Sequence, residues 1–409
     1  MLGLATSAGF GDRLGLATPG HVRSARRHPA VAPVFAQQSV RENERTGRTP
    51  QQVLDDAMWG LFQEGWREPW GADADHLKTP QDVEPFAAAG YTFYTIDPGG
   101  HVDDGADRAR LGEVEARLTA LPWNELEDSQ ADLEARYLGR PLDLEDVCLS
   151  FSRDSLWRAA VKYGRAVTYT ASMYRHIASL MAGRPFELEV SVDETHTPTS
   201  ALEHYYIASE LRRLGVCWSS LAPRLVGRFE KGVDYIGNLA ELEGAVKQHA
   251  AVARALRPYK LSLHSGSDKF SIYPTIAEQT RGLVHLKTAG TSYLEAVRVV
   301  AHVDAPLFRE LLAFALERYE TDRASYHVSA QLDRVPAPRT LSDTELPGLL
   351  DQFDARQVLH ITYGSLLDRH GEQLLDLLRQ QEEVYHALLE AHFELHLTPF
   401  DGPNTGGAS

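Results

Sequence analysis

Cysteine is scarce in this sequence: the 409 residues contain two, Cys148 and Cys217. Two isolated thiols argue against a disulfide-stapled secreted scaffold and against a cysteine-rich zinc site, so we expect both to be reduced. Long apolar runs are also missing, and none approaches the roughly 20 residues that a transmembrane helix requires. Gly3, Ser7 and Gly9 interrupt the first apolar stretch, which therefore lacks the pattern of a signal peptide. These absences predict a cytoplasmic protein without membrane contact.

The chain also lacks an excess of positive charge. Its 57 acidic residues outnumber the 41 lysines and arginines, and the formal net charge is -16, so a nucleic acid is not an expected partner. A small anionic substrate remains compatible with this charge, because a local basic pocket can form on an acidic protein. The length allows one large domain with additions, or two domains, and a homo-oligomer is compatible with either.

Eight short segments, rich in β-branched or aromatic residues, predict β-strands, and helical segments separate most of them. The strands are expected at residues 31–37, 91–96, 188–192, 216–221, 260–263, 283–287, 325–328 and 358–362. Alternating strands and helices imply parallel pairing through right-handed crossovers, and eight such units predict a closed (β/α)8 TIM-type barrel. An open doubly wound sheet is the alternative. It is weakened because no G-x-G-x-x-G motif follows an early strand, and we therefore expect no nicotinamide cofactor.

Three parts of the chain are assigned around this barrel. Residues 1–370 are expected to form the barrel, with an acidic, partly helical insertion at residues 101–182. Residues 371–397 predict one long amphipathic C-terminal helix, on which His386, His392 and His396 are expected at the surface. Residues 398–409 predict a disordered tail.

The most informative stretch of the chain is L-S-L-H-S-G-S-D-K-F-S-I-Y-P, at residues 261–274. An apolar strand ends in His264 and opens at once into a loop of small residues, which Asp268 and Lys269 follow. Such a loop suits an anionic, hydroxyl-rich ligand beside a metal ion or a proton-transfer group. The alternative is a strand followed by a polar turn, with His264 as a hydrogen-bonded core histidine.

A metal site is predicted from the residues at several strand ends, since the active site of a (β/α)8 barrel lies at the C-terminal ends of its strands. His264 follows one expected strand, His327 and His360 each lie on another, and Asp193 and Glu194 follow a fourth. Three histidines and a carboxylate suit one divalent ion, such as Zn, Mn, Co, Ni or Fe. We assign Glu194 as the carboxylate ligand, although the alternation of a strand leaves open which of the two acids faces inward.

The same strand ends predict a binding region for an anionic substrate. Its expected members are Gln38, Arg41, Arg224, Ser265, Ser267, Lys269 and Lys287. Asp193 and Asp268 end two different strands, and we expect them to face each other across the barrel mouth as an acid/base pair. In the alternative, Asp268 only pairs with Lys269, and Asp193 caps the next helix.

Several long motifs resemble those of the tagaturonate epimerase family of bacterial hexuronate catabolism. They are G-F-G-D-R-L-G-L-A-T-P-G-H (9–21), F-A-Q-Q-S-V-R-E-N-E-R-T-G-R-T-P (35–50), V-D-E-T-H-T-P-T-S (192–200), S-L-A-P-R-L-V-G-R-F-E-K-G-V-D-Y (220–235), L-H-S-G-S-D-K-F-S-I-Y-P (263–274) and H-L-K-T-A-G-T-S-Y-L-E-A (285–296). The similarity runs from residue 9 to residue 365 and does not extend to the acidic insertion or the C-terminal tail. The resemblance implies an enzyme that interconverts D-fructuronate and D-tagaturonate and uses a divalent metal ion.

The resemblance also implies a type of chemistry. The two ketouronates differ at C4, which is β to the C2 ketone, so the carbonyl does not acidify the C4–H bond. Breaking and remaking the C3–C4 bond by retro-aldol and aldol steps is then easier than proton removal, with the metal ion as Lewis acid. Two other functions stay open: a metal-dependent aldolase that releases the fragments, and a non-catalytic sugar-acid binding protein.

Overall fold

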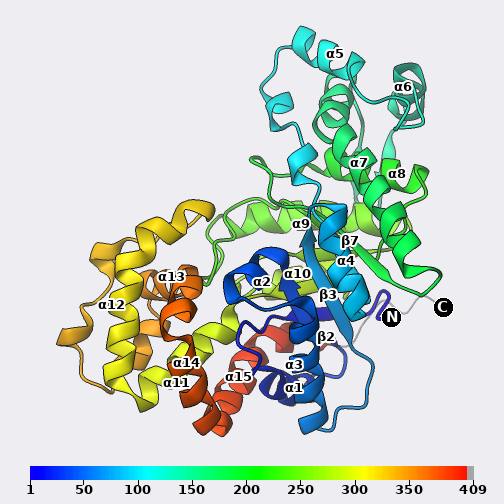
Figure 1. The fold of residues 1–409 in the computed structure, drawn as a ribbon. Coiled ribbons are helices and arrows are strands. Elements are labelled where there is room, and N and C mark those ends of the chain that lie inside the picture. Colours follow the sequence, from blue (N-terminus) through cyan, green and yellow to red (C-terminus); the bar gives the residue numbers. More distant parts are fainter. Residues whose placement is uncertain (403–409) are drawn as a thin grey trace.

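A closed barrel of eight parallel strands forms the centre of the protein in the computed structural model, which describes residues 1–402 (Figure 1). The barrel strands are β1 (Ser7–Phe10), β2 (Ala32–Ser39), β3 (Gly71–Leu77), β4 (Phe93–Ile96), β7 (Glu187–Val192), β8 (Ser220–Pro223), β9 (Lys260–Leu263) and β10 (Val284–Thr288). Each strand pairs with the next one along the chain, and Ser7 of β1 pairs with both Ala32 of β2 and His285 of β10, which closes the ring. The expected (β/α)8 TIM-type fold is confirmed.

Two of the eight expected strands are wrong. Residues 358–362 belong mostly to helix α13 (Phe353–Ile361), in which every residue from 354 to 361 is buried. A short, fully buried helix has the same apolar run as a buried strand, so periodicity does not separate the two. Residues 325–328 leave a 3-10 turn (Arg323–Ser325) as irregular chain.

Strands β1 and β3 replace them in the barrel. β1 consists of small residues and one phenylalanine within the glycine-rich N-terminal segment. β3 reads G-A-D-A-D-H-L, and its alanines and aspartates are poor strand formers. Asp73 and Asp75 are tolerated there because both carboxylates contact the ammonium group of Lys287, 2.8 and 2.6 Å away. The low strand propensity of β3 therefore reflects a polar barrel interior.

Helices surround the barrel on its outer side. They are α1 (Thr18–Arg27), α2 (Val40–Thr46), α3 (Pro50–Gln63), α4 (Pro80–Ala89), α8 (Ala201–Arg213), α9 (Leu239–Ala255), α10 (Tyr273–Thr280) and α11 (Thr291–Val303). Several begin with a strong local signal: Thr79 and Ser200 form capping boxes at the start of α4 and α8. No helix within residues 1–402 has both the length and the apolar character needed to cross a membrane.

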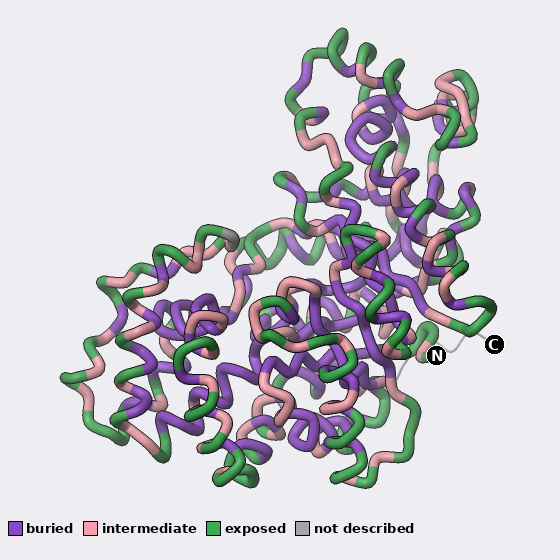
Figure 2. The backbone as a smooth tube through the Cα atoms, in the orientation of Figure 1, coloured by how far each residue is buried: buried purple, intermediate pink, exposed green. Residues whose placement is uncertain are grey.

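A separate lobe lies between β4 and β7, above the barrel in Figure 1. It contains α5 (Leu111–Thr119), α6 (Gln130–Tyr137), a hairpin of β5 (Leu142–Leu144) and β6 (Val147–Leu149), and the long helix α7 (Arg153–Met181). Figure 2 shows that buried residues continue from the barrel into this lobe, along α7. The lobe is thus packed onto the barrel.

The C-terminal region is helical, but not in the expected way. It contains α12 (Ala305–Asp322), α13, α14 (Tyr363–Gln380) and α15 (Glu382–Leu397), so two helices stand where one was expected at residues 371–397. α15 packs against α1 and β1, and Phe393 contacts the rings of Phe10 and His21. The expected surface position of the α15 histidines is therefore wrong: His386 and His396 are buried. Part of the expected tail is a 3-10 turn (Thr398–Phe400), and residues 403–409 lie outside the described residues.

Candidate functional site

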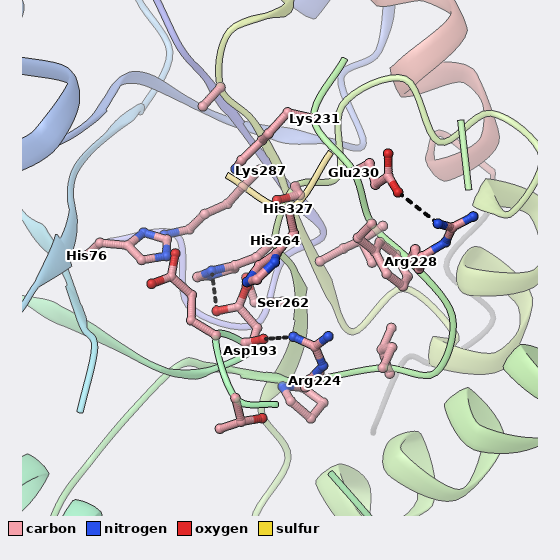
Figure 3. A pocket seen from close by; sticks show the side chains of 18 of the residues that line it. His76, Asp193, Arg224, Arg228, Glu230, Lys231, Ser262, His264, Lys287 and His327 are labelled. Carbon is pink, nitrogen blue, oxygen red and sulfur yellow. Dashed lines mark hydrogen bonds and ion pairs between the residues drawn. The ribbon is translucent and has the colours of Figure 1, made fainter. Parts of the chain in front are cut away.

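A cavity of about 480 Å³ opens at the C-terminal ends of the barrel strands. Residues of β2, β3, β9 and β10 form its floor, and the loops at residues 193–196 and 223–231 form its walls, together with Tyr326 and His327. Figure 3 shows this cavity from close by. A cavity of this size is typical of a small-molecule site. Of the predicted site residues, the cavity is lined by Arg41, Asp193, Glu194, Arg224, His264, Ser265, Lys287 and His327.

Three potential metal ligands converge in this cavity: His76 at the end of β3, Asp193 after β7 and His264 after β9. One ligand atom from each lies within 4.8 Å of the other two, and Figure 3 shows the three side chains directed toward a common space. The His264 Nδ1 atom lies 3.2 Å from the Asp193 Oδ1 atom. His76 has a φ of 55°, unusual for a residue other than glycine, at an irregularity in the β3 register. Such a conformation is typical of functional positions.

The surroundings of the two histidines fit a metal ion. The Nδ1 atom of His76 lies 2.7 Å from an Asp75 oxygen, and the Nε2 atom of His264 lies 2.6 Å from a Glu189 oxygen. Metal-bound histidines usually bond a carboxylate through their second nitrogen in this way, which orients the ring. The remaining nitrogen of each ring is then available beside Asp193. Two imidazoles and a carboxylate are a donor set for a divalent transition metal.

The charges of this group are strongly coupled. Burial by itself raises the pKa of the Asp193 carboxyl, but the neighbouring His264 outweighs burial and lowers it. Burial lowers the pKa of His264, and Asp193 and Glu189 reverse this and raise it to about 10. The carboxylates therefore stabilise positive charge at the position between them, which is the electrostatic condition for binding a cation.

Lys287 lies beneath the metal-ligand group. Its ammonium group is buried and contacts Asp73, Asp75, Glu189 and Thr95 at 2.6 to 2.9 Å. An ammonium group has three hydrogens to donate, so these four oxygens use its full capacity. Although Lys287 lines the cavity as expected, its visible role is to neutralise the carboxylates that orient the two histidines.

Two cationic side chains of the cavity, Arg41 and Lys231, form no hydrogen bond or ion pair with other side chains among residues 1–402. Arg224 donates to the Asp193 backbone oxygen at 3.3 Å, and Arg228 pairs with Glu230. Arg41 instead lies over the Tyr326 ring, 5.2 Å from its centroid, and forms no hydrogen bond or ion pair with another residue of the described chain. Its guanidinium is thus available for an anionic ligand.

Other predicted site residues lie outside the cavity. Lys269 is fully buried, and its ammonium group donates to the backbone oxygens of Glu230, Val233 and Ser267; burial lowers its pKa to about 8. It therefore holds the loop after β8 in place. The Ser267 hydroxyl donates to a backbone oxygen, and the Gln38 side chain lies by Thr46.

The predicted convergence of His264, His327 and His360 is wrong. Within residues 1–402, two groups could hold a metal ion, and neither contains His327 or His360. His360 is buried on α13 and packs against Gly232 and Gly290, whereas His327 is exposed at the cavity rim. Both expected strands were misassigned, so their ends do not meet the end of β9.

The second of these groups contains Asp268, His392 and His396, which bond to other parts of the protein, while the Asp268 Oδ2 atom has no hydrogen-bond partner in the described chain. The Asp268 Oδ1 atom lies 2.9 Å from both Arg356 Nη2 and His392 Nε2. The His396 Nε2 atom accepts the Asp268 backbone N–H, and its Nδ1 donates to the His392 backbone oxygen. Asp268 therefore fixes α15 and α13 to the barrel. It neither faces Asp193 across the cavity nor pairs mainly with Lys269.

Sequence reasoning missed Asp73, Asp75, His76 and Glu189. The signal was alternation: in β7, Glu187, Glu189, Ser191 and Asp193 share one face, which marks Asp193 as the inward acid. Glu194, expected as the ligand, lies at the cavity rim and pairs with Lys78 at 3.2 Å. In β3, alternating aspartates before a histidine give the same signal.

Comparison with known proteins shows the family of this chain. The family model for tagaturonate epimerase matches residues 2–400. The tagaturonate/fructuronate epimerase of Thermotoga maritima is 45% identical over 402 residues, which are 98% of this chain and 82% of that protein. Two crystal structures of the fructuronate-tagaturonate epimerase from Cohnella laeviribosi are also similar. The one with two glycerols has a TM-score of 0.93 at 39% identity and covers 98% of this chain and 82% of that chain. The one with one glycerol has a TM-score of 0.92 at 40% identity, with 97% and 81% covered. The chain therefore belongs to the tagaturonate epimerase family and is a carbohydrate epimerase, an isomerase.

Proposed function

We propose that this protein interconverts D-fructuronate and D-tagaturonate at C4 and that His76, Asp193 and His264 hold a divalent metal ion. The carrying observation is the arrangement of these three side chains at the floor of a cavity that also contains Arg41. Two histidines, each oriented by a carboxylate, form a donor set for a metal ion. A partner-free arginine in the same cavity suits the carboxylate of a uronate. The names of the relatives support the same substrates.

The arrangement suits cleavage of the C3–C4 bond. When bound, the metal ion supplies a Lewis acid for the C2 carbonyl. Arg41 holds the C6 carboxylate, so the substrate extends between the two with C4 in the middle. Glu194 accepts the C4 hydroxyl proton as the C3–C4 electron pair moves toward C2, which yields an aldehyde and an enediolate. After the aldehyde turns, the enediolate carbon attacks its other face, and Glu194 returns the proton to the new C4 oxygen.

The charges around Glu194 keep its side chain ionised, as a proton acceptor must be. Four charged groups act on its carboxyl: His76, Asp193, Lys78 and Arg41. Burial raises its pKa, but the three cationic groups outweigh burial and Asp193, so the net shift is downward. Glu194 is thus an ionised carboxylate within range of both the metal-ligand group and Arg41, beside the position proposed for C4.

The proposal is tested by incubating the full chain with D-fructuronate and Mn²⁺ in D₂O and following the products by NMR. We expect D-tagaturonate with no deuterium at C4, because the C4–H bond is never broken. Deuterium at C4 would contradict the retro-aldol route, and accumulation of three-carbon products would instead show an aldolase. Absence of any conversion would contradict an epimerase with these substrates.

Arg41→Met is expected to raise KM for D-fructuronate while changing kcat less. The substitution removes a charge-assisted hydrogen bond, which contributes about 1.5–3 kcal/mol, or about a 10- to 100-fold change in KM. Steady-state kinetics beside the control Arg228→Met would show this, since Arg228 already pairs with Glu230. An unchanged KM in a folded Arg41→Met protein would place the carboxylate elsewhere.

A further inference from the structure

The lobe between β4 and β7 contacts the loop that carries Asp193. We call residues 193–200, between β7 and α8, the Asp193 loop. Its first four residues, Asp193, Glu194, Thr195 and His196, line the cavity. Figure 1 shows α7 and α8 side by side above the barrel, where the lobe approaches this loop. The loop is therefore shared between the cavity and the lobe.

Lys162 of α7 makes the main connection. Its side chain is 1% exposed, and its Nζ atom lies 2.9 Å from oxygens of Asp107, Thr197 and Glu203. These residues belong to the lobe, the Asp193 loop and α8, respectively. The Thr197 hydroxyl accepts from Lys162 and donates to Asp107. The three N–H groups of the Lys162 ammonium thus each have an acceptor. This one buried cation joins the lobe, the Asp193 loop and α8.

Two further contacts lead from this point to the cavity. Asp104 of the lobe accepts the His196 backbone N–H at 3.2 Å, and its carboxylate also lies 3.3 Å from His196 Nδ1. Within the loop, the Thr195 hydroxyl donates to the Thr197 backbone oxygen at 3.0 Å. The residues next to Asp193 are therefore tied to the residue that Lys162 holds. The acidic side chains of the lobe serve as partners for Lys162 and His196.

We propose that Lys162 is a positioning residue, through which the lobe holds Asp193 at the distance that metal binding requires. This inference rests on the proposed function, since it takes Asp193 as a metal ligand. Asp193 follows the last residue of β7, so its carboxylate depends on the loop for its place beside His76 and His264. Groups that hydrogen-bond a metal ligand directly change metal affinity about 10- to 100-fold when they are removed, and we expect the low end of this range for Lys162, which acts through Thr197.

Lys162→Met tests the inference, with Arg136→Met as a matched control. Arg136 also bridges the lobe and α8, through Asp128 and Glu210, but does not contact the Asp193 loop. The Mn²⁺ dissociation constant, kcat and KM with saturating Mn²⁺, and the melting temperature would be measured on the full chain. Both variants are expected to melt lower. Lys162→Met alone should weaken Mn²⁺ binding, by about tenfold, and lower kcat, with KM changed less because Arg41 forms no hydrogen bond or ion pair with the Asp193 loop.

Thr197→Val is a second variant in case Lys162→Met does not fold. It removes the loop hydroxyl and leaves Lys162 its two carboxylates, so the fold should persist while Mn²⁺ binding weakens. Normal Mn²⁺ affinity and kcat in Thr197→Val, and in Lys162→Met if it folds, would overturn the positioning role of Lys162 but not the proposed metal site. A wild-type protein that binds no Mn²⁺ would overturn the proposed metal site as well, so the two failures are distinguishable.

Discussion

His76→Ala is expected to abolish metal binding and turnover while the barrel stays folded. The imidazole supplies one of three converging ligands, and its other nitrogen bonds Asp75 at the cavity edge, where it does little for core packing. Loss of an outer support costs about 10–100-fold in metal affinity, so loss of a ligand should exceed that. Metal content after dialysis against Mn²⁺, turnover of D-fructuronate and circular dichroism would be measured together.

His327→Ala is the matched control for this experiment. His327 lies at the rim of the same cavity, but it does not belong to the converging group. The variant should therefore keep its metal ion, even if substrate binding changes. If His76→Ala kept its full metal content and His327→Ala bound no metal, the assignment would be wrong. The ligand set predicted from the sequence, which includes His327, would then be favoured.

The fold class was predicted correctly because two wrongly assigned strands were matched by two missed ones, so the expected number of strands was still eight. Residues 325–328 and 358–362, in the C-terminal helical region, had the sequence pattern of strands. The real strands β1 and β3 lacked that pattern because they contain small or acidic residues. β3 was missed for a functional reason. Asp73 and Asp75 are unfavourable in a strand, and both are stabilised there by contact with Lys287, which lies more than two hundred positions later in the sequence. Pairing of this kind is invisible in local propensity.

The candidate site was predicted where strand ends were correctly placed. The ends of β7, β8 and β9 brought Asp193, Arg224 and His264 to the cavity, as expected. The prediction failed a few residues further on. Once the chain leaves β9, it turns through Ser265 and Asp268, both with positive φ, and Lys269 is directed into the protein. Alternation applies within a strand, and it carries no information about a loop with left-handed residues.

The polar interior of the barrel supports the candidate metal site. Asp75 and Glu189 orient His76 and His264, and Lys287 neutralises both carboxylates. This network is an outer layer of the same site, formed from strands β3, β7 and β10. A substitution in it should therefore act on metal affinity before it acts on the substrate.

Glu194→Gln is expected to lower kcat by about 10²–10⁴-fold with the metal ion still bound. Glutamine keeps the shape of the side chain and can still bond Lys78, but it cannot accept the C4 hydroxyl proton. KM should change little, because Arg41 and the metal-ligand group are untouched. The measurements are kcat per bound Mn²⁺ and KM for D-fructuronate, beside the metal content.

Asp268→Asn provides the contrast for this prediction, since it alters a buried carboxylate outside the cavity. Asp268 bonds Arg356 and His392, and these partners outweigh burial and hold its pKa well below the usual value of 3.8. Its contribution to stability is therefore present above about pH 4 and is lost as the pH falls further. At neutral pH, Asp268→Asn should melt at a lower temperature and keep normal kcat in its folded fraction. If Asp268→Asn instead lost turnover with unchanged stability while Glu194→Gln stayed active, the proton acceptor would have to be sought near α15, because the two carboxylates lie in separate parts of the structure.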